Sequence, residues 1–180
     1  DGIALDVSGG KMYWTDWSTN KIQRADLDGS NVEDLVTTGL DNPSGIALDV
    51  SRDKMYWTAV GPDKIQRADL DGSNVEDLVT TGLPSPYGIA LDVSGGKMYW
   101  TDEVTDKIQR ADLDGSNVED LVTTGLSFPH GIALDVSGGK MYWTDWRTDK
   151  IQRADLDGSD VENLFTTGLY NPYGIALYFP

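Results

Sequence analysis

Apolar and polar residues follow a strand-like pattern along the chain, in short stretches separated by turns. In residues 2–7 apolar and mixed positions alternate at every second residue, which is typical of a strand with one buried face. Residues 11–16 and 21–27 are rich in strand-forming residue types, whereas residues 32–38 form a weaker fourth run. Because glycines and turn pairs leave no room for a helix of about ten residues, the pattern predicts four short antiparallel strands.

The same pattern recurs every 43 residues. Each copy begins with Gly-Ile-Ala-Leu, at Gly2, Gly45, Gly88, Gly131 and Gly174. A repeat of this length with four strands has the size of one blade of a β-propeller. We therefore predict an all-β propeller with four-stranded antiparallel blades, in a single repeat domain over residues 1–180. The predicted blades are 1–43, 44–86, 87–129 and 130–172, followed by a spare innermost strand at 173–180.

A tetrapeptide in the second strand carries a family resemblance. Tyr-Trp-Thr-Asp stands at 13–16, 99–102 and 142–145, and Tyr-Trp-Thr-Ala stands at 56–59. The flanking Gly-Ile-Ala-Leu-Asp and Leu-Asp-Gly strings also fit, so the whole chain resembles the YWTD β-propellers of the low-density lipoprotein receptor family (LDL-receptor class B repeats). Similar propellers occur in nidogen-like matrix proteins. The resemblance implies an extracellular or secreted protein whose Gly-Ile-Ala-Leu strands are innermost.

The resemblance also assigns a structural role to the tetrapeptide aspartate, which in this family hydrogen-bonds across to a neighbouring blade. Asp16, Asp102 and Asp145 are expected to have this inter-blade role. Ala59 cannot have it, so we expect a weaker contact at the second blade.

The number of blades differs from the family pattern, which implies six. A blade buries both of its faces only against neighbouring blades, and an open set of four would leave two apolar faces in water. Three solutions are open: a piece of a longer protein, a closed four-bladed ring, or self-association that completes a propeller ring. We favour the first and the third over a monomeric ring.

Charge narrows the classes of partner. The chain has 30 acidic and 14 basic residues, a net charge of −16, and the acidic residues are spread evenly over the repeats. Nucleic acid needs lysine and arginine to displace counterions, and anionic membranes attract basic surfaces, so we expect neither as a partner. No apolar run approaches the roughly 20 residues that cross a bilayer.

Candidate chemistry is sparse. There is no cysteine, and His130 is the only histidine. No nucleophile motif lies beside His130, so we expect an exposed loop imidazole, no catalytic residue, no enzyme activity and no cofactor. The Asp-Leu-Asp-Gly strings fit a hairpin better than a calcium loop. Aspartates that recur on the innermost strand are weak candidates for binding a cation in the channel: Asp6, Asp49, Asp92 and Asp135.

Differences between the copies are concentrated in two connections. Residues 17–20 and their equivalents join the second and third strands, and residues 41–44 and their equivalents join one blade to the next. Antiparallel order places both connections on one face of the disc, where aromatic side chains accumulate. Aromatic residues suit binding surfaces because they bring a large rigid area at a small entropic cost.

We therefore predict a non-catalytic scaffold that binds a protein or peptide ligand through this variable face. The predicted contact residues are Trp17, Asn42, Tyr87, Glu103, Phe128, His130, Trp146, Arg147, Tyr170 and Tyr173. The alternative is a purely structural or metal-stabilised repeat module without a dedicated ligand, which could be a fragment or a consensus design. In that case the loops vary because variation is tolerated there. A hydrolase that uses the channel carboxylates is less favoured, because catalytic pairs need unlike environments.

Overall fold

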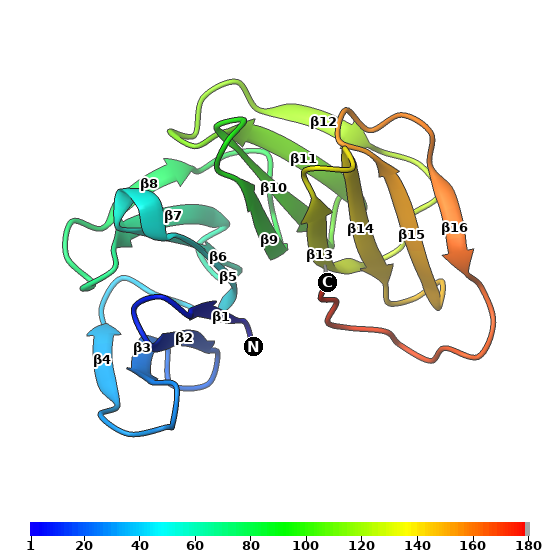
Figure 1. Ribbon diagram of the computed structural model, residues 1–180. Coiled ribbons are helices and arrows are strands. Elements are labelled where there is room, and N and C mark those ends of the chain that lie inside the picture. Colours follow the sequence, from blue (N-terminus) through cyan, green and yellow to red (C-terminus); the bar gives the residue numbers. More distant parts are fainter. Residues whose placement is uncertain (179–180) are drawn as a thin grey trace. The chain divides into compact units, whose positions relative to one another are not determined.

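A computed structural model describes residues 1–178 of the chain. Its contacts divide it into two compact units, Asp1–Pro86 and Tyr87–Pro180, and each unit is described by itself below. Each unit contains two antiparallel four-stranded sheets in which the strands follow one another in chain order. These sheets are the predicted blades, and the predicted all-β propeller fold class is confirmed (Figure 1). The single repeat domain and its blade boundaries stay predictions.

The first unit holds two blades. The strands of blade 1 are β1 (Ile3–Asp6), β2 (Lys11–Asp16), β3 (Lys21–Asp26) and β4 (Glu33–Val36). The strands of blade 2 are β5 (Pro43–Asp49), β6 (Lys54–Ala59), β7 (Lys64–Asp69) and β8 (Glu76–Val79). A short 3-10 helix, η1 (Val50–Arg52), replaces the usual glycine turn between β5 and β6.

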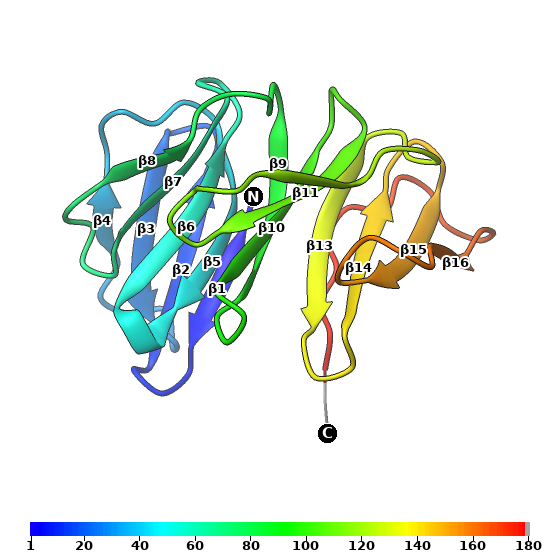
Figure 2. The same cartoon turned by 90° about the horizontal axis from the view of Figure 1, so that it is seen from above.

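The second unit repeats this arrangement. The strands of blade 3 are β9 (Pro86–Asp92), β10 (Lys97–Asp102), β11 (Lys107–Asp112) and β12 (Glu119–Val122). The strands of blade 4 are β13 (Pro129–Asp135), β14 (Lys140–Asp145), β15 (Lys150–Asp155) and β16 (Glu162–Phe165). Figure 2 shows the strands of blade 4, from β13 to β16, side by side from a second direction.

The observed strands follow the hydrophobic pattern closely. β2 coincides with the predicted run 11–16, while β1 and β4 are shorter at both ends than predicted. Tyr13 pairs with Ala4 on one side and Arg24 on the other, and the register shifts by a bulge between Ile22 and Gln23. Pleating therefore sends neighbouring residues of β2 to opposite faces of the blade.

The apolar core of each unit lies between its two blades. In the first unit, Tyr13, Ile22 and Val36 of blade 1 and Met55, Trp57, Ala68 and Leu70 of blade 2 belong to one buried cluster. In the second unit, Tyr99, Ile108 and Val122 of blade 3 and Met141, Trp143 and Ala154 of blade 4 form the equivalent cluster. One face of each blade thus supplies a tyrosine and aliphatic residues, and the opposite face of the next blade supplies methionine and tryptophan.

Polar contacts repeat at the same interfaces. Thr101 Oγ1 donates to His130 O at 2.6 Å, and Arg110 Nη1 donates to Leu156 O at 3.0 Å. In the first unit Arg24 Nη1 makes the matching bond to Leu70 O at 3.2 Å. These bonds satisfy backbone carbonyls that the neighbouring strands leave unpaired.

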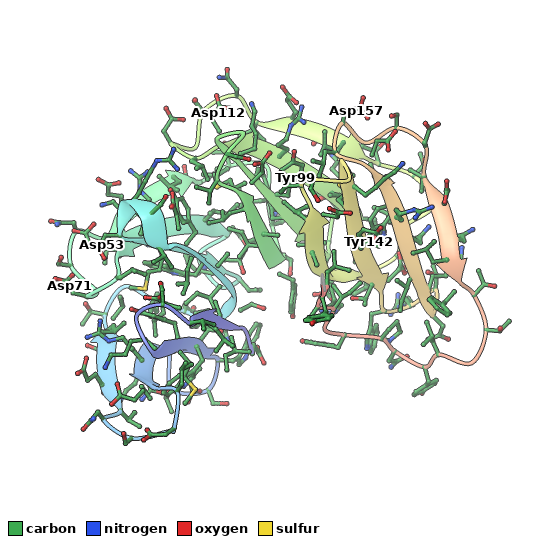
Figure 3. All side chains as sticks on the ribbon, viewed as in Figure 1. Asp53, Asp71, Tyr99, Asp112, Tyr142 and Asp157 are labelled. Carbon is green, nitrogen blue, oxygen red and sulfur yellow. The ribbon has the colours of Figure 1, made fainter. Side chains whose placement is uncertain are left out.

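The constant turns have backbone reasons to stay constant. Gly10 has φ 69° and Gly29 has φ 84°, a region that side chains disfavour and glycine adopts freely. Asp71, Asp112 and Asp157 lie in or beside the Asp-Gly turns of their blades (Figure 3). In these turns the serine two residues after the Asp-Gly aspartate bonds to its carboxylate, as Ser73 N–H does to Asp71 at 2.8 Å, so the geometry is that of the predicted hairpin.

The C-terminal segment lies against blade 4 without forming a ladder. Gly131 N–H donates to Tyr173 O at 3.0 Å, and no strand is assigned to residues 173–178. Each of the strands β1, β5, β9 and β13 pairs with the Tyr-Trp strand that follows it. The last two residues of the predicted spare strand, 179–180, lie outside the described residues. No helix in residues 1–178 is both long and apolar enough to span a membrane.

Candidate partner-binding face

The two variable connections lie side by side in each unit. In the first unit Val60 N–H donates to Asn42 O, and Gly61 N–H donates to Asp41 O, both at 3.1 Å. In the second unit Trp146 N–H donates to Phe128 O at 3.0 Å, in the equivalent positions. The inter-blade connection therefore contacts the connection between the second and third strands, as the antiparallel order requires. We call the surface formed by these connections the loop face.

Asparagine and aspartate side chains hold the backbone of the inter-blade connections on this face by hydrogen bonds. Asn20 Oδ1 accepts from Asn42 N–H at 2.8 Å, and Asp106 Oδ1 accepts from Phe128 N–H at 2.8 Å. Asp149 Oδ1 does the same for a backbone N–H of the last inter-blade connection, at 2.7 Å.

Sequence reasoning missed these anchoring residues. Asn20 has φ 55°, Asp106 has φ 52° and Asp149 has φ 55°. The signal was available, because the fourth residue of this connection is Asn or Asp in every copy. These residue types tolerate positive φ better than other side chains and bond readily to backbone N–H groups.

Five rings of the second unit form a continuous aromatic cluster: Tyr87, Phe128, His130, Trp146 and Tyr173. The centroid of the His130 ring lies 4.4 Å from that of Tyr87 and 4.3 Å from that of Tyr173. The Trp146 centroid lies 6.3 Å from His130 and 6.0 Å from Phe128. All five residues were predicted to be contact residues, and this structure brings them together.

Phe128 has an unusual backbone. Its φ is 58°, a left-handed conformation that is an outlier for a bulky residue and that costs of order 1–3 kcal/mol. The Asp106 and Trp146 hydrogen bonds hold it there, and the Arg147 guanidinium lies 4.2 Å from the centre of its ring. Arg147 is exposed, so the cluster ends at the surface in a cation stacked on an aromatic ring.

His130 corrects one expectation. It lies in β13 and not in a loop, and only 5% of its surface is exposed, so it is not the exposed imidazole that we expected. Burial between two tyrosine rings lowers the pKa of His130 to about 4, because burial disfavours the charged form. The imidazole is therefore neutral at pH 7, and its Nδ1 has no hydrogen-bond partner in the described part of the chain.

Glu103 supplies the negative charge beside this cluster. Its Oε1 lies 3.9 Å from His130 Nε2. Burial, and secondarily the Glu103 carboxylate, raise the pKa of Tyr87 well above its usual range, and the same two causes raise the pKa of Tyr173. The tyrosine hydroxyls therefore stay protonated.

The remaining predicted contact residues lie elsewhere on their units. Tyr170 is 86% exposed. Trp17 and Asn42 belong to the first unit, where the Asn42 amide, assigned with its O and N exchanged so that both atoms are satisfied, accepts from Trp17 Nε1 at 2.5 Å and donates to Asp41 Oδ1 at 2.8 Å. The structure thus forms one large aromatic cluster in the second unit and a smaller polar contact in the first.

The described bonds of the tetrapeptide aspartates differ between Asp145 and Asp16. Asp145 Oδ2 accepts from Ser127 N–H at 2.7 Å, a bond from one blade to the connection that precedes it. The described bonds of Asp16 run to Ser18 and Thr19 in its own blade, at 3.0 Å each. Asp102 Oδ1 accepts from Thr105 N–H at 2.8 Å.

The innermost-strand aspartates are used by their own turns. Asp6 Oδ1 accepts from Ser8 Oγ at 2.7 Å and from Gly9 N–H at 2.8 Å, and these bonds lower its pKa. Asp92 and Asp135 repeat this arrangement, and Asp49 bonds to the Ser51 hydroxyl and to Arg52. No group of three or more His, Asp or Glu residues with metal-ligand geometry occurs among residues 1–178.

Known sequences match the chain in two ways. A family model described as the virginiamycin B lyase family matches residues 2–179. The human low-density lipoprotein receptor-related protein 4 is 53% identical over 38 residues, which is 21% of this chain and 2% of the receptor. The human low-density lipoprotein receptor-related protein 5 is 49% identical over 41 residues, again 2% of the receptor. The chain therefore matches only a small part of these long receptors.

Solved structures repeat this twofold likeness. A crystal structure of a nidogen/laminin complex contains a chain with TM-score 0.92 and 33% identity, over 98% of this chain and 68% of that one. An inactive variant of virginiamycin B lyase from Staphylococcus aureus, with quinupristin, has TM-score 0.76 and 21% identity over 93% of this chain and 56% of that one. The second likeness shows the fold alone.

Proposed function

The chain belongs to the virginiamycin B lyase family and is a YWTD-repeat propeller of the LDL-receptor type, and on that premise we propose that it is a non-catalytic scaffold that binds a protein or peptide partner through the loop face. Its similarity to a chain of a nidogen/laminin complex supports this class of function. We further propose that the protein is extracellular, as those relatives suggest, and that copies of it associate through surfaces other than the loop face.

The aromatic cluster of the second unit is the observation that carries the proposal. It combines rigid rings with the exposed cation of Arg147, and it lies where the repeats differ. Interface hot spots are enriched in tryptophan, tyrosine and arginine. Because backbone anchors hold the connections, partner binding would order few additional groups.

Panning a random-peptide display library on the immobilised chain tests the proposal. Selected peptides are then measured against Arg147→Glu and Tyr170→Ala, two substitutions at exposed loop-face positions. We expect Arg147→Glu to weaken binding about tenfold or more, which corresponds to about 1.4 kcal/mol, with an unchanged melting temperature. Laminin, the partner in the nidogen complex, is the first protein probe.

Val136→Glu provides the matched control. Val136 is 38% exposed in the glycine hairpin that joins β13 and β14, away from the variable connections. The substitution introduces a glutamate, as Arg147→Glu does, but removes no positive charge. Peptides that lose affinity for Val136→Glu and keep it for Arg147→Glu would contradict the loop-face proposal, as would a library that yields no binder.

A lyase activity is the second candidate, because the family model carries that name and because His130 lies beside Glu103. His130 is a weak candidate for a general base, because its pKa is about 4 and its ring is buried. Incubation with quinupristin followed by mass spectrometry tests this activity. Loss of the compound that depends on His130 would support the lyase and contradict the non-catalytic scaffold.

A further inference from the structure

The first and fourth blades each present one half of an interface that the chain also builds internally. We call the side of a blade that packs on the preceding blade its leading side, and the opposite side its trailing side. On leading sides, Leu27 of blade 1 is 44% exposed, whereas its equivalent Leu70 in blade 2 is 6% exposed. On trailing sides, Phe165 of blade 4 is 57% exposed, whereas its equivalent Val36 in blade 1 is 5% exposed.

Hydrogen-bonding groups are unused at the same two places. Arg24 and Arg110 each donate through Nη1 to a leucine carbonyl of the next blade. Arg153, their equivalent in blade 4, donates to Glu162 at 2.6 Å, and within the described residues it makes no bond to a carbonyl of another blade. The carbonyl that would accept from Arg153 in a repeated interface is that of Leu27, the equivalent of Leu70 and Leu156.

Glycine environments reveal the same two gaps. A Cβ added to Gly72 would lie 2.5 Å from Leu35 O, yet the equivalent Gly29 has nothing within 4 Å. A Cβ added to Gly131 would lie 2.6 Å from Tyr173 O, yet the equivalent Gly174 also has nothing within 4 Å. Gly29 and Gly174 thus lack the close backbone contact that their equivalents Gly72 and Gly131 make.

We propose that the trailing side of blade 4 binds the leading side of blade 1 in a second copy of the chain. The occupant follows from continuity with the internal interfaces, because the two exposed sides carry, apart from Phe165 in place of a valine, the apolar residue types that pack together between blades 1 and 2. The contact is head-to-tail, so each copy offers two different surfaces and further copies can add. The interface is distinct from the loop face.

The C-terminal segment determines how the copies join. Tyr173 O accepts from Thr144 Oγ1 at 2.7 Å, as His130 O accepts from Thr101 Oγ1. Residues 174–177 therefore begin where the innermost strand of a next blade would begin. A second copy brings its own Gly-Ile-Ala-Leu, in residues 2–5, to the same place, so one of the two identical segments has to move.

The exchange that fits is a strand swap. Residues 174–177 of one copy pair with β2 of the second copy and displace residues 2–5, which pair with β2 in the single chain. Because both segments have the same sequence, the hydrogen bonds that are lost are replaced by equal ones, which makes such a swap a low-cost route to association. The two exposed apolar sides are buried in addition.

Molar mass in solution tests the proposal. Sedimentation velocity of the full chain over a range up to ~100 µM, the concentration range of weak association, should show masses above the 19.7 kDa monomer that rise with concentration. Leu27→Glu blocks the leading side and Phe165→Glu blocks the trailing side, and both positions are exposed, so both variants should fold and remain monomeric. Val104→Glu, at a loop position that is 63% exposed, should associate like the parent chain.

Mixing the two blocked variants distinguishes a head-to-tail contact from others. The Leu27→Glu copy keeps its trailing side and the Phe165→Glu copy keeps its leading side, so an equimolar mixture should form a 1:1 dimer and stop there. Monomeric parent chain at the highest concentration would overturn the proposal. Variants that still self-associate, or that stay monomeric when mixed, would also overturn it.

Two further substitutions test the details. Gly174→Val should leave the melting temperature of the single chain unchanged, because no atom lies within 4 Å of a Cβ added at Gly174. The same substitution should abolish association. In the swapped position the valine side chain would meet Ser44 O of the second copy, just as a Cβ added to Gly2 would lie 2.6 Å from Ser44 O. Phe165→Val restores the residue of the internal interfaces and should tighten association. A Gly174→Val chain that associates normally would overturn the strand swap, and a Phe165→Val chain with weaker association would overturn the repeated interface.

Discussion

Arg110 and Arg153 allow the contribution of one inter-blade hydrogen bond to be measured within a single protein. Both guanidinium groups bond to a half-exposed glutamate, Glu119 or Glu162, and lie about equally far from a tyrosine ring, at 5.8 and 6.0 Å. Only Arg110 also donates to a carbonyl of the next blade, Leu156 O. Tyr99 and Tyr142, the two rings concerned, are labelled in Figure 3.

The structure gives the expected size of the difference. Substitution of either arginine by methionine removes an exposed ion pair, which contributes about 0–1 kcal/mol, and a cation–π contact of about 0.5–1 kcal/mol. Arg110→Met also removes a hydrogen bond to a charged donor and leaves the Leu156 carbonyl unpaired, a loss of about 1.5–3 kcal/mol. We therefore expect Arg110→Met to lower the free energy of unfolding by about 2 kcal/mol more than Arg153→Met.

Urea denaturation of the two variants at low protein concentration measures this difference. At about 2 kcal/mol, the melting temperatures should differ by about 4–8 °C for a chain of this size. Equal losses within about 0.5 kcal/mol would refute the reasoning, because surface substitutions vary by that amount. At concentrations where copies associate, Arg153→Met should become more damaging, since Arg153 would then also donate to a carbonyl.

Three more predictions concern single sites. The pKa of His130 is about 4 in the folded chain and near 6.5 when exposed, so the unfolded chain binds a proton as the pH falls from 6.5 to 4, and the folded chain loses stability in that window. The variant His130→Phe should remove up to about 3 kcal/mol of this loss, which urea denaturation at pH 4 and pH 7 measures. Equal pH dependence of the parent chain and the variant would contradict this prediction. The double variant Asp41→Ser, Ala59→Asp copies the Ser127–Asp145 pair into the first unit and should raise the free energy of unfolding by about 1 kcal/mol. Urea denaturation of the double variant and of each single variant measures this gain, and no gain would mean that the pair adds nothing there. EDTA should leave the melting temperature unchanged, because Asp6 and its equivalents already bond to their own turns; a lowered melting temperature would support the metal-stabilised module instead.

The strand pattern could be predicted because it depends on local signals that recur four times. β2 and its equivalents combine β-branched and aromatic residues between two turns, and Gly10 and Gly29 mark turns whose positive φ only a few residues adopt. The two-residue periodicity then decides which side chains face which neighbour.

The environment of His130 could not be predicted in the same way. Its position follows a proline in a variable connection, which suggests an exposed loop. In the structure that residue extends a seven-residue strand, β13, and the rings of Tyr87 and Tyr173 bury it. Those residues are 43 positions away on either side, so their packing depends on the distance between successive innermost strands, which no local pattern records.

The loop face shows why variation between the copies is informative at some positions and not at others. The glycine hairpins stay nearly constant because positive φ at Gly10 and Gly29 favours glycine, with Asp53 at φ 58° as the exception in blade 2, and this near-constancy needs no functional cause. In the variable connections the backbone anchors Asn20, Asp106 and Asp149 persist while the side chains around them change. A fixed frame with changing contact residues is the organisation of binding loops on rigid scaffolds. The anchors have a backbone reason of their own to persist, because Asn20, Asp106 and Asp149 adopt positive φ, so the proposed binding face depends on the changing side chains around the anchors and not on the anchors themselves.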